Sequence, residues 1–289
     1  MVLGITANVD KPEVKKPLRK VVTWLRRNRV DFILEDSTSE YLGQPEMDAP
    51  IHSLPDFGDK CDMVLAFGGD GTILSTARSL APHGIPVLGV KVGGMGFLAE
   101  LIPDDLWTGL EDILQGNYKI AERMMLSARI VDERDVRFHA LNDFVLDKGA
   151  LPRVVRIRTY IDGQFLNTYI GDGLIIATPT GSTAYSLAAG GPILLPDMDA
   201  ILITPISPHS LAARPVVISA DKKIKVVVEF APEDIILSAD GQTSVQLTEG
   251  DKVIFERSEY RMKLVSYTGR SFYDVLRAKL NWGEDVRGV

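Results

Sequence analysis

The chain has 289 residues, of which 45% are hydrophobic and 25% charged, and its formal net charge is −7. This is the composition of a globular protein, long enough for one large domain or two ordinary ones and for a core that needs neither disulfides nor a structural metal. The negative charge argues against binding nucleic acid by bulk electrostatics. The sequence has no run of about 18 apolar residues, so we expect no contact with a membrane.

The N-terminal residues 1–10 lack the charged and apolar regions of a signal peptide and are interpreted as a first strand. Cys61 is the single cysteine, which fits a reducing compartment. We therefore expect a cytoplasmic protein.

Strand-like and helix-like segments alternate over residues 1–120, which predicts an α/β domain with a parallel sheet. The apolar runs typical of strands are residues 2–7, 30–34, 63–67 and 86–90. The segments with helical periodicity are residues 12–29, 73–80 and 103–114. Residues 37–59 carry Pro, Gly and acidic side chains without a clear period, so we expect a loop or linker there.

Short β-rich runs follow one another over residues 121–270, which predicts an all-β second domain, a sandwich or stacked sheets. These runs are residues 126–131, 138–146, 154–161, 174–178, 201–204, 223–230, 235–239, 252–256 and 263–266. Asp162-Gly163 lies between two such runs and predicts a hairpin. Residues 271–280 return to helical periodicity. We expect this C-terminal helix to return to the first domain, which would then comprise residues 1–120 and 271–289.

The first candidate motif is Phe67-Gly-Gly-Asp-Gly-Thr-Ile-Leu74, at the end of an apolar strand. Gly69 and Gly71 leave room for a polyphosphate, and Thr72 can open a helix whose N-terminal amides favour an anion. A carboxylate such as Asp70 is unfavourable beside phosphates unless it binds Mg²⁺ or takes a proton from an attacking hydroxyl. The alternative is an ordinary turn in which Asp70 caps the helix.

A second motif spans residues 171–192, where a β-run leads into a loop rich in hydroxyl groups and glycine. Thr180, Ser182 and Thr183 can donate to phosphate or ribose oxygens, and Tyr185 offers a flat face to a ring. The alternative is a helix N-terminus capped by Ser and Thr, which accounts for one or two hydroxyls but not for the whole cluster.

Together these two motifs resemble the NAD kinase family. The first loop alone is also similar to loops of diacylglycerol kinases, sphingosine kinases and phosphofructokinases, whereas residues 171–192 are far more specific. The resemblance extends in order to residues 92–98, 141–144, 204–211 and 238–242, and so covers roughly residues 63–242.

The resemblance implies a role for Asp70 as the base, or the phosphate-orienting carboxylate, that acts on a ribose 2′-hydroxyl. It implies that Gly69 and Gly71 make room for phosphate and that Phe97 walls the nucleotide pocket. The residues that would bind the dinucleotide are Asn142, Asp143, Asp172, Thr180, Thr183, Ala184 and Tyr185, with Thr72 in the phosphate loop. No role follows for His209 or Asp240, and no protein metal ligand is assigned.

Three positions depart from the family pattern. Asp143 stands where a glutamate is usual, so its carboxylate reaches one methylene less far. Lys91 stands where asparagine is common; it can supply positive charge near phosphates or lie in solvent at the strand end. Met95 stands where a polar or basic residue is frequent.

The resemblance implies an NAD kinase that transfers a phosphoryl group from ATP, or from polyphosphate, to the 2′-hydroxyl of the adenosine ribose of NAD. It also implies Mg²⁺ with the nucleotide and assembly as a homodimer or homotetramer. Two alternatives stay open from the residues: a lipid kinase of the diacylglycerol type and a non-catalytic nucleotide sensor. Neither a P-loop nor a paired C-x-x-C zinc site is present in the sequence.

Overall fold

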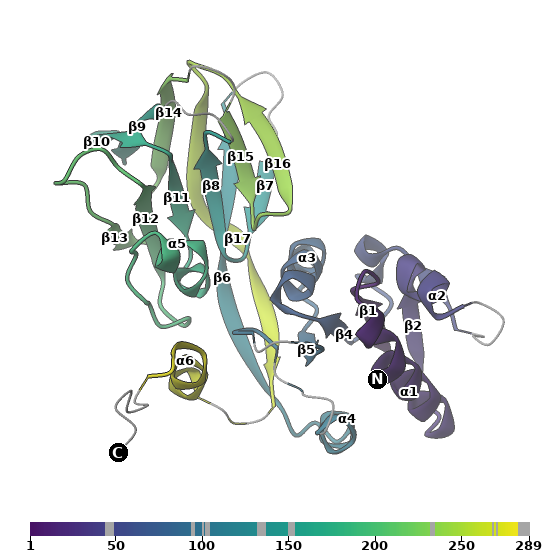
Figure 1. The fold of residues 1–289 in the computed structure, drawn as a ribbon. Helices are drawn as coiled ribbons and strands as arrows, with labels where there is room; N and C mark the ends of the chain where they lie inside the picture. The colour runs from purple at the N-terminus through teal and green to yellow at the C-terminus, as the bar shows by residue number, and fades with distance from the viewer. Residues whose placement is uncertain are drawn as a thin grey trace. The chain divides into compact units, whose positions relative to one another are not determined.

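The structure is a computed structural model, and it describes residues 1–43, 49–93, 96–99, 101, 105–131, 137–149, 154–231, 235–267, 269 and 271–282. The chain divides into two compact units. The first comprises Met1–Glu122 and Met262–Val289, and the second comprises Arg123–Arg261. Figure 1 shows the strands of the second unit and the helices that accompany the sheet of the first.

The first unit contains the predicted parallel sheet, and its strand order is β3-β2-β1-β4-β5. Its strands are β1 (Leu3–Ala7), β2 (Phe32–Glu35), β3 (Ile51–His52), β4 (Met63–Gly68) and β5 (Val87–Lys91). β1 and β4 are buried along their whole length, which explains why they are continuous apolar runs. The chain winds outwards in both directions from β1 and β4, so these neighbours form the topological switch point of the sheet.

Helices α1 (Lys15–Arg27) and α4 (Leu106–Leu114) contribute to one apolar cluster with the strands. α1 buries Leu18, Val21, Val22 and Leu25 at helical spacing and leaves its basic side chains in solvent. α3 (Asp70–Leu80) lies close to β5, since a methyl carbon on Gly89 would be 2.4 Å from Cδ1 of Ile73. Short 3-10 turns complete the unit, at η1 (Pro12–Val14), η3 (Leu54–Phe57) and η4 (Ala81–His83).

The prediction of a loop over residues 37–59 is wrong in part, because this stretch contains most of α2 (Asp36–Leu42) together with β3 and η3. Residues 44–48 lie outside the described part. α2 has no apolar periodicity and is held instead by polar tertiary contacts. Thr38 Oγ1 accepts a hydrogen bond from the backbone N–H of Ala7 at 3.0 Å and donates to Glu35 at 3.2 Å. Contacts of this kind leave no sequence pattern.

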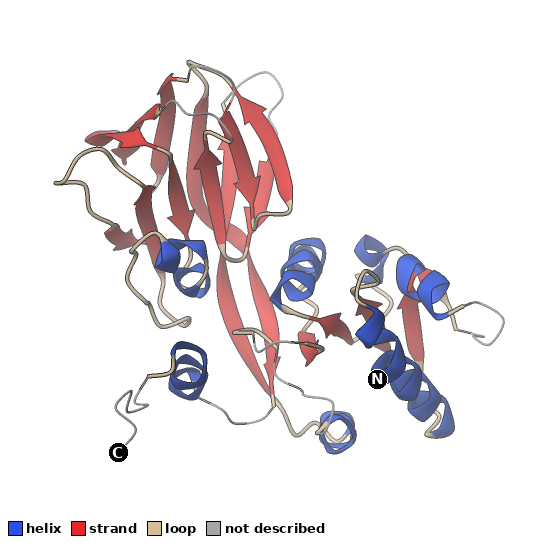
Figure 2. Cartoon of the chain, viewed as in Figure 1, coloured by secondary structure: helices blue, strands red, loops and turns tan. Residues whose placement is uncertain are grey.

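The second unit is a sandwich of two antiparallel sheets, which confirms the predicted all-β architecture (Figure 2). One sheet has the order β13-β12-β11-β8-β15-β16; the other contains β10-β9-β14-β17, with β6 beside β17 and β7 beside β6. The strands of the first are β13 (Val216–Ser219), β12 (Ala200–Ile206), β11 (Gly173–Ala177), β8 (Asp143–Asp147), β15 (Ile235–Ala239) and β16 (Thr243–Leu247). Those of the second are β10 (Gln164–Gly171), β9 (Val155–Ile161), β14 (Ile224–Phe230), β17 (Lys252–Ser266), β6 (Lys119–Ile130) and β7 (Arg137–Ala140).

Both sheets of the second unit share one core, in which the rings of Phe144 and Phe255 lie 5.5 Å apart. The predicted hairpin is present, since Asp162 and Gly163 join β9 to β10 with φ values of 48° and 80°. The sequence predicts two strands at residues 252–256 and 263–266, but the structure has a single strand, β17. Its charged middle part still pairs, because polar side chains alternate there with buried ones such as Ser258 and Met262.

Helix α6 (Phe272–Leu280) confirms the predicted C-terminal helix and belongs to the first unit. Ser271 and Asp274 cap its N-terminus reciprocally, which fixes where the helix begins. Lys279 Nζ lies 5.3 Å from the centroid of the Phe97 ring, so the helix contacts the segment that follows β5. No helix of the described residues is long and apolar enough to cross a membrane.

Candidate active site

Asp70 begins helix α3 immediately after β4, at the carboxyl edge of the parallel sheet. Its Oδ2 accepts the backbone N–H of Phe97 at 2.7 Å, and its Oδ1 accepts that of Leu98 at 3.1 Å. A methyl carbon on Gly96 would lie 1.9 Å from Asp70 Oδ1, so this carboxylate needs a glycine beside it. The structure thus brings Asp70 and Phe97 together, and it holds the carboxylate in one orientation.

The glycines of this loop leave space at the backbone. A methyl carbon on Gly68 would be 2.2 Å from Oγ1 of Thr72, which explains why that position has no side chain. Thr72 Oγ1 is buried and has no hydrogen-bond partner among the residues that the structure describes. At Gly69 the nearest atom to an added methyl carbon is Nζ of Lys11, at 3.7 Å. The loop therefore presents bare backbone at the helix N-terminus, as a phosphate site requires.

In the second unit, Asn142 and Asp143 lie at the start of β8, and Asp240 holds them there. Asp240 Oδ1 accepts the N–H groups of Asn142 at 2.8 Å and Asp143 at 3.2 Å, and its Oδ2 accepts that of Leu141 at 3.1 Å. Asp240 occupies the β15–β16 turn with φ of 51°. The sequence assigned Asp240 no role, because its partners lie about a hundred residues away along the chain.

Asp143 is only 5% exposed. Burial, and secondarily the charge of Asp240, raise the pKa of its carboxyl to about 7. Asp240 itself accepts hydrogen bonds from three backbone N–H groups. At neutral pH Asp143 is therefore divided between its acid and its carboxylate, and it can donate or accept a hydrogen bond.

The hydroxyl-rich loop packs directly on this pair. A methyl carbon on Gly181 would lie 2.1 Å from the carbonyl oxygen of Asn142, so only glycine fits. Thr178 donates its backbone N–H to Asn142 O at 2.8 Å and its hydroxyl to Leu141 O at 2.6 Å. The loop forms η5 (Thr180–Thr183) and α5 (Tyr185–Ala188).

Ser182 is fully buried and bonds to Pro179 O at 2.6 Å and to Leu194 N at 3.0 Å. It is a structural residue, contrary to the expectation that it donates to a ligand. Thr183 donates to Thr180 O at 3.2 Å, and Ala184 closes the turn by bonding Gly181 O at 2.9 Å. Thr180 is 7% exposed, and its buried Oγ1 has no hydrogen-bond partner in the described part of the chain.

Tyr185 brings the remaining predicted residues together. Its side chain is 43% exposed. Partial burial is the main cause that raises the pKa of its phenol, and the nearby charges of Asp147, Asp172 and Asp143 raise it further. Asp172 pairs with Lys148 at 2.6 Å, and this hydrogen bond lowers the pKa of Asp172. Asn142, Asp143, Asp172 and Tyr185 thus belong to one region of the second unit, whereas Asp70 and Phe97 belong to the first.

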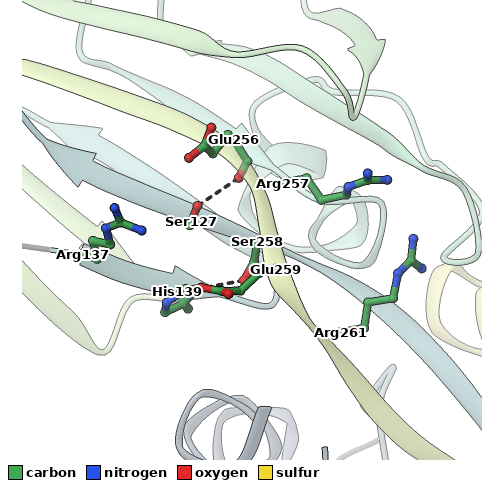
Figure 3. A pocket seen from close by; sticks show the side chains of 8 residues that line it. All are labelled: Ser127, Arg137, His139, Glu256, Arg257, Ser258, Glu259 and Arg261. Carbon is green, nitrogen blue, oxygen red and sulfur yellow. Dashed lines mark hydrogen bonds between the residues drawn. The ribbon is translucent and has the colours of Figure 1, made fainter. Parts of the chain in front are cut away.

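Another cavity of the second unit, of about 500 Å³, lies where β6, β7 and β17 meet (Figure 3). Its charges are largely matched by the protein itself. Arg261 bonds both oxygens of Asp199, Arg257 lies 3.5 Å from the same carboxylate, and Glu256 pairs with Lys223 at 2.8 Å. His139 Nδ1 lies 3.0 Å from Ser258 Oγ. This network accounts for the cavity as a structural feature.

The first unit has a doubly wound sheet with an aspartate-bearing glycine loop, and the second is a sandwich that carries hydroxyl and carboxylate groups. Together these features define a phosphotransferase that acts on a nucleotide. Two family models match the chain: the ATP-NAD kinase N-terminal domain over residues 3–118 and the ATP-NAD kinase C-terminal domain over residues 141–267. The chain belongs to the NAD kinase family.

Curated relatives have similar lengths. An NAD kinase of Desulforamulus reducens is 42% identical over 280 residues, covering 96% of each chain. One of Geobacter metallireducens is 40% identical over 284 residues, covering 98% of this chain and 99% of its own. Among solved structures, yeast NADH kinase complexed with NADH has a TM-score of 0.89 and 26% identity, over 100% of this chain and 90% of its own. An Archaeoglobus fulgidus NAD kinase in complex with ATP, 24% identical, has the same fold with a TM-score of 0.77, over 97% and 99%.

Proposed function

We propose that the protein transfers the terminal phosphoryl group of ATP to the 2′-hydroxyl of the adenosine ribose of NAD, giving NADP. The family and the site together make the chain an NAD kinase. The observation that carries the assignment is the carboxylate of Asp70, fixed by two backbone N–H groups at a helix N-terminus whose loop has room for phosphate.

Asp70 aligns the attacking hydroxyl. Each of its oxygens accepts one backbone N–H and keeps a further lone pair for the substrate. The 2′-oxygen forms its bond to the γ-phosphorus while the bond from that phosphorus to the ADP oxygen breaks, and the hydroxyl proton passes to Asp70. Because such transition states are loose, positioning contributes more than base strength.

The acceptor nucleotide is bound by the groups of the second unit. Asp143, in its carboxylate form, accepts ribose hydroxyls, and Tyr185 offers its exposed ring for stacking. Because the side chain of Asp143 is one methylene shorter than that of glutamate, the ribose would have to approach closer to the backbone at the start of β8. The yeast relative was crystallised with NADH, and we propose that NADH competes with NAD at the same groups.

Mg²⁺ accompanies the donor in this proposal. The described residues contain no group of three or more His, Cys, Asp or Glu side chains that could hold a metal ion. Magnesium is usually bound by one or two carboxylates together with substrate phosphates, so the proposal requires no cage of protein ligands. When bound, the ion would neutralise charge on the phosphates, and Asp70 is the carboxylate that we propose would hold it together with them.

We infer that the protein forms a homodimer or homotetramer in the cytoplasm. Leu211 and Phe165 of the second unit are 93% and 60% exposed, and large apolar side chains in solvent often mark an interface. The free thiol of Cys61 is compatible with a reducing compartment. Light scattering coupled to size-exclusion chromatography measures the assembly; a monomer at micromolar concentration contradicts it.

The decisive experiment incubates purified protein with NAD, ATP and Mg²⁺ and detects NADP with an NADP-specific dehydrogenase. We expect steady turnover that depends on all three components. Tripolyphosphate, longer polyphosphate and NADH are supplied in parallel reactions to identify the donor and the acceptor. Folded protein that forms no product in any of these reactions contradicts the proposed function.

A further inference from the structure

The first unit has a pocket of about 620 Å³, lined by residues of α1, of α4 and of the segment that ends β5. Three of its lining side chains are Lys16, Lys20 and Lys91, and Glu13 is the acidic one. Trp107, which is half-buried, forms an aromatic wall. Trp24 lies next to that wall, with the two ring centroids 6.1 Å apart.

Among the described lining residues of this pocket, lysines outnumber acidic side chains three to one. Lys16 and Lys20 are four residues apart on α1 and so project from the same face of the helix. Among the described residues, no carboxylate lies within ion-pair distance of Lys16, Lys20 or Lys91. Like charges brought together in this way repel one another, and the repulsion is relieved when an anion binds between them. These lysines give the pocket a local positive charge on a chain whose net charge is −7.

The lining of the pocket adjoins the Asp70 loop through backbone pairing in the sheet. Lys91 pairs in register with Gly68 across β4 and β5, and the backbone N–H of Val92 donates to Gly68 O at 2.9 Å. The next residue, Gly93, lines the pocket. The residues that line one end of the pocket are therefore the immediate sheet neighbours of the phosphate loop.

Lys11 lies between the two. Its Nζ is 3.7 Å from the position of a methyl carbon on Gly69 and 3.7 Å from that on Gly93. The backbone of Lys11 is fixed, since Tyr41 donates its hydroxyl to Lys11 O at 3.0 Å and Lys11 N donates to Asn8 O at 3.3 Å. Lys11 follows β1 and Asp70 follows β4, so they flank the switch point of the sheet, where ligands of doubly wound sheets bind.

We propose that Lys11 and this basic pocket bind the leaving part of the phosphoryl donor, a chain of phosphates that extends from the Asp70 loop across Lys11 towards Lys91, Lys16 and Lys20. The proposal rests on the phosphoryl transfer proposed above and adds the place where the donor lies. A lysine is suited to this task because its ammonium group is a compact charge that can follow successive phosphates.

The first test measures binding of inorganic tripolyphosphate by calorimetry, without NAD, to wild-type protein and to the double variant Lys16→Ala/Lys20→Ala. We expect Kd to rise about tenfold, because each lysine contributes a charge-assisted hydrogen bond. The control variant Arg29→Ala/Lys60→Ala removes the same charge from residues that precede β2 and β4, at the opposite edge of the sheet, and should leave Kd unchanged. Equal Kd values for wild type and Lys16→Ala/Lys20→Ala overturn the proposal.

The second test uses kinetics. Lys11→Ala and Lys16→Ala/Lys20→Ala should raise KM for the donor about tenfold and leave KM for NAD unchanged. A rise in both KM values overturns the assignment to the donor. Since the calorimetric test needs no turnover, a protein that forms no NADP but loses tripolyphosphate binding in the variants contradicts the proposed function while supporting this site.

Trp107→Leu distinguishes the two sources of a phosphate chain. A nucleoside triphosphate can stack its base on the indole ring, whereas inorganic polyphosphate cannot. A greater loss of ATP binding than of tripolyphosphate binding identifies a nucleotide as the occupant. Equal effects on the two ligands identify the inorganic chain. The melting temperature of each variant is recorded to exclude unfolding as the cause.

Discussion

In the first unit, Asp70 has one backbone N–H on each oxygen and is half-buried, so its carboxylate is fixed while part of it faces outward. In the second unit, three backbone N–H groups converge on Asp240, and its neighbour Asp143 is buried beside that charge. The two backbone donors hold the first carboxylate in the orientation that can align a hydroxyl. In the second unit, burial and secondarily the charge of Asp240 raise the pKa of the Asp143 carboxyl to about 7.

This difference shows that the chemistry of an aspartate is set by what surrounds it. Identical side chains acquire different properties when backbone donors orient one of them and burial raises the pKa of another. The following variants test this comparison.

The largest effect is expected for Asp70→Asn. The amide keeps the shape of the side chain but cannot take the hydroxyl proton, so kcat should fall about a thousandfold. The circular dichroism spectrum should show a folded protein, with a modest fall in melting temperature, because the amide keeps one acceptor oxygen for the two backbone N–H groups of Phe97 and Leu98. Turnover near the wild-type value would remove Asp70 from the mechanism.

Asp240→Ala should act on stability. It leaves the N–H groups of Leu141, Asn142 and Asp143 without their acceptor, which should lower the free energy of unfolding by about 2 to 3 kcal/mol. KM for NAD should rise as well, since the Asn142–Asp143 segment loses its anchor. Asp240→Asn, which retains one acceptor oxygen, serves as the milder control. Urea denaturation gives the comparison; unchanged stability in both variants would contradict the anchoring role.

Two glycine variants distinguish the roles of the two units, because each variant is expected to change a different kinetic parameter. In Gly96→Ala the methyl group meets Asp70 Oδ1, and displacement of this carboxylate should reduce kcat about a hundredfold. In Gly181→Ala the methyl group meets Asn142 O, and KM for NAD should rise instead. Neither glycine has positive φ, so backbone strain does not explain the effects. The assignment fails if both variants change the same parameter.

The smallest effect concerns pH. Asp143 has a folded-state pKa of about 7, above the value of about 4 expected for an unfolded chain. Between these values the folded state binds more protons, so stability should decrease as pH rises from 4 to 7 and level off above. Asp143→Asn should remove this contribution, on the order of 2 kcal/mol between pH 5 and 8. Parallel stability profiles for wild type and variant would show that Asp143 does not titrate there.

Sequence patterns predicted those parts of the fold that depend on local periodicity. The buried runs of β1 and β4, the apolar stripe of α1 and the Asp162-Gly163 turn are of this kind. The part of α2 that falls within the predicted loop is stabilised by the contacts of Thr38 with Ala7 and Glu35. The charged middle of β17 is stabilised by pairing with its neighbouring strands. Tertiary contacts decide these elements, and no local signal reports them.

The same distinction applies to the site. Asp70, Asn142, Asp143 and Tyr185 were predicted because they lie in recognisable motifs. Ser182 was misassigned, since its burial against Pro179 and Leu194 depends on the fold of the loop. Asp240 and Lys11 act through partners distant in sequence, so their contribution follows only from the coordinates.

Cys61 also has a practical use. It precedes β4, its Sγ lies against Gly4 and Phe57, and burial raises the pKa of its thiol to about 11. At neutral pH about one molecule in ten thousand carries the reactive thiolate, so maleimides should modify this position slowly. A cysteine introduced at an exposed position of either unit would therefore react first. Fluorescent or spin labels could then be attached to the otherwise native protein, and the separation of the two units could be followed during turnover.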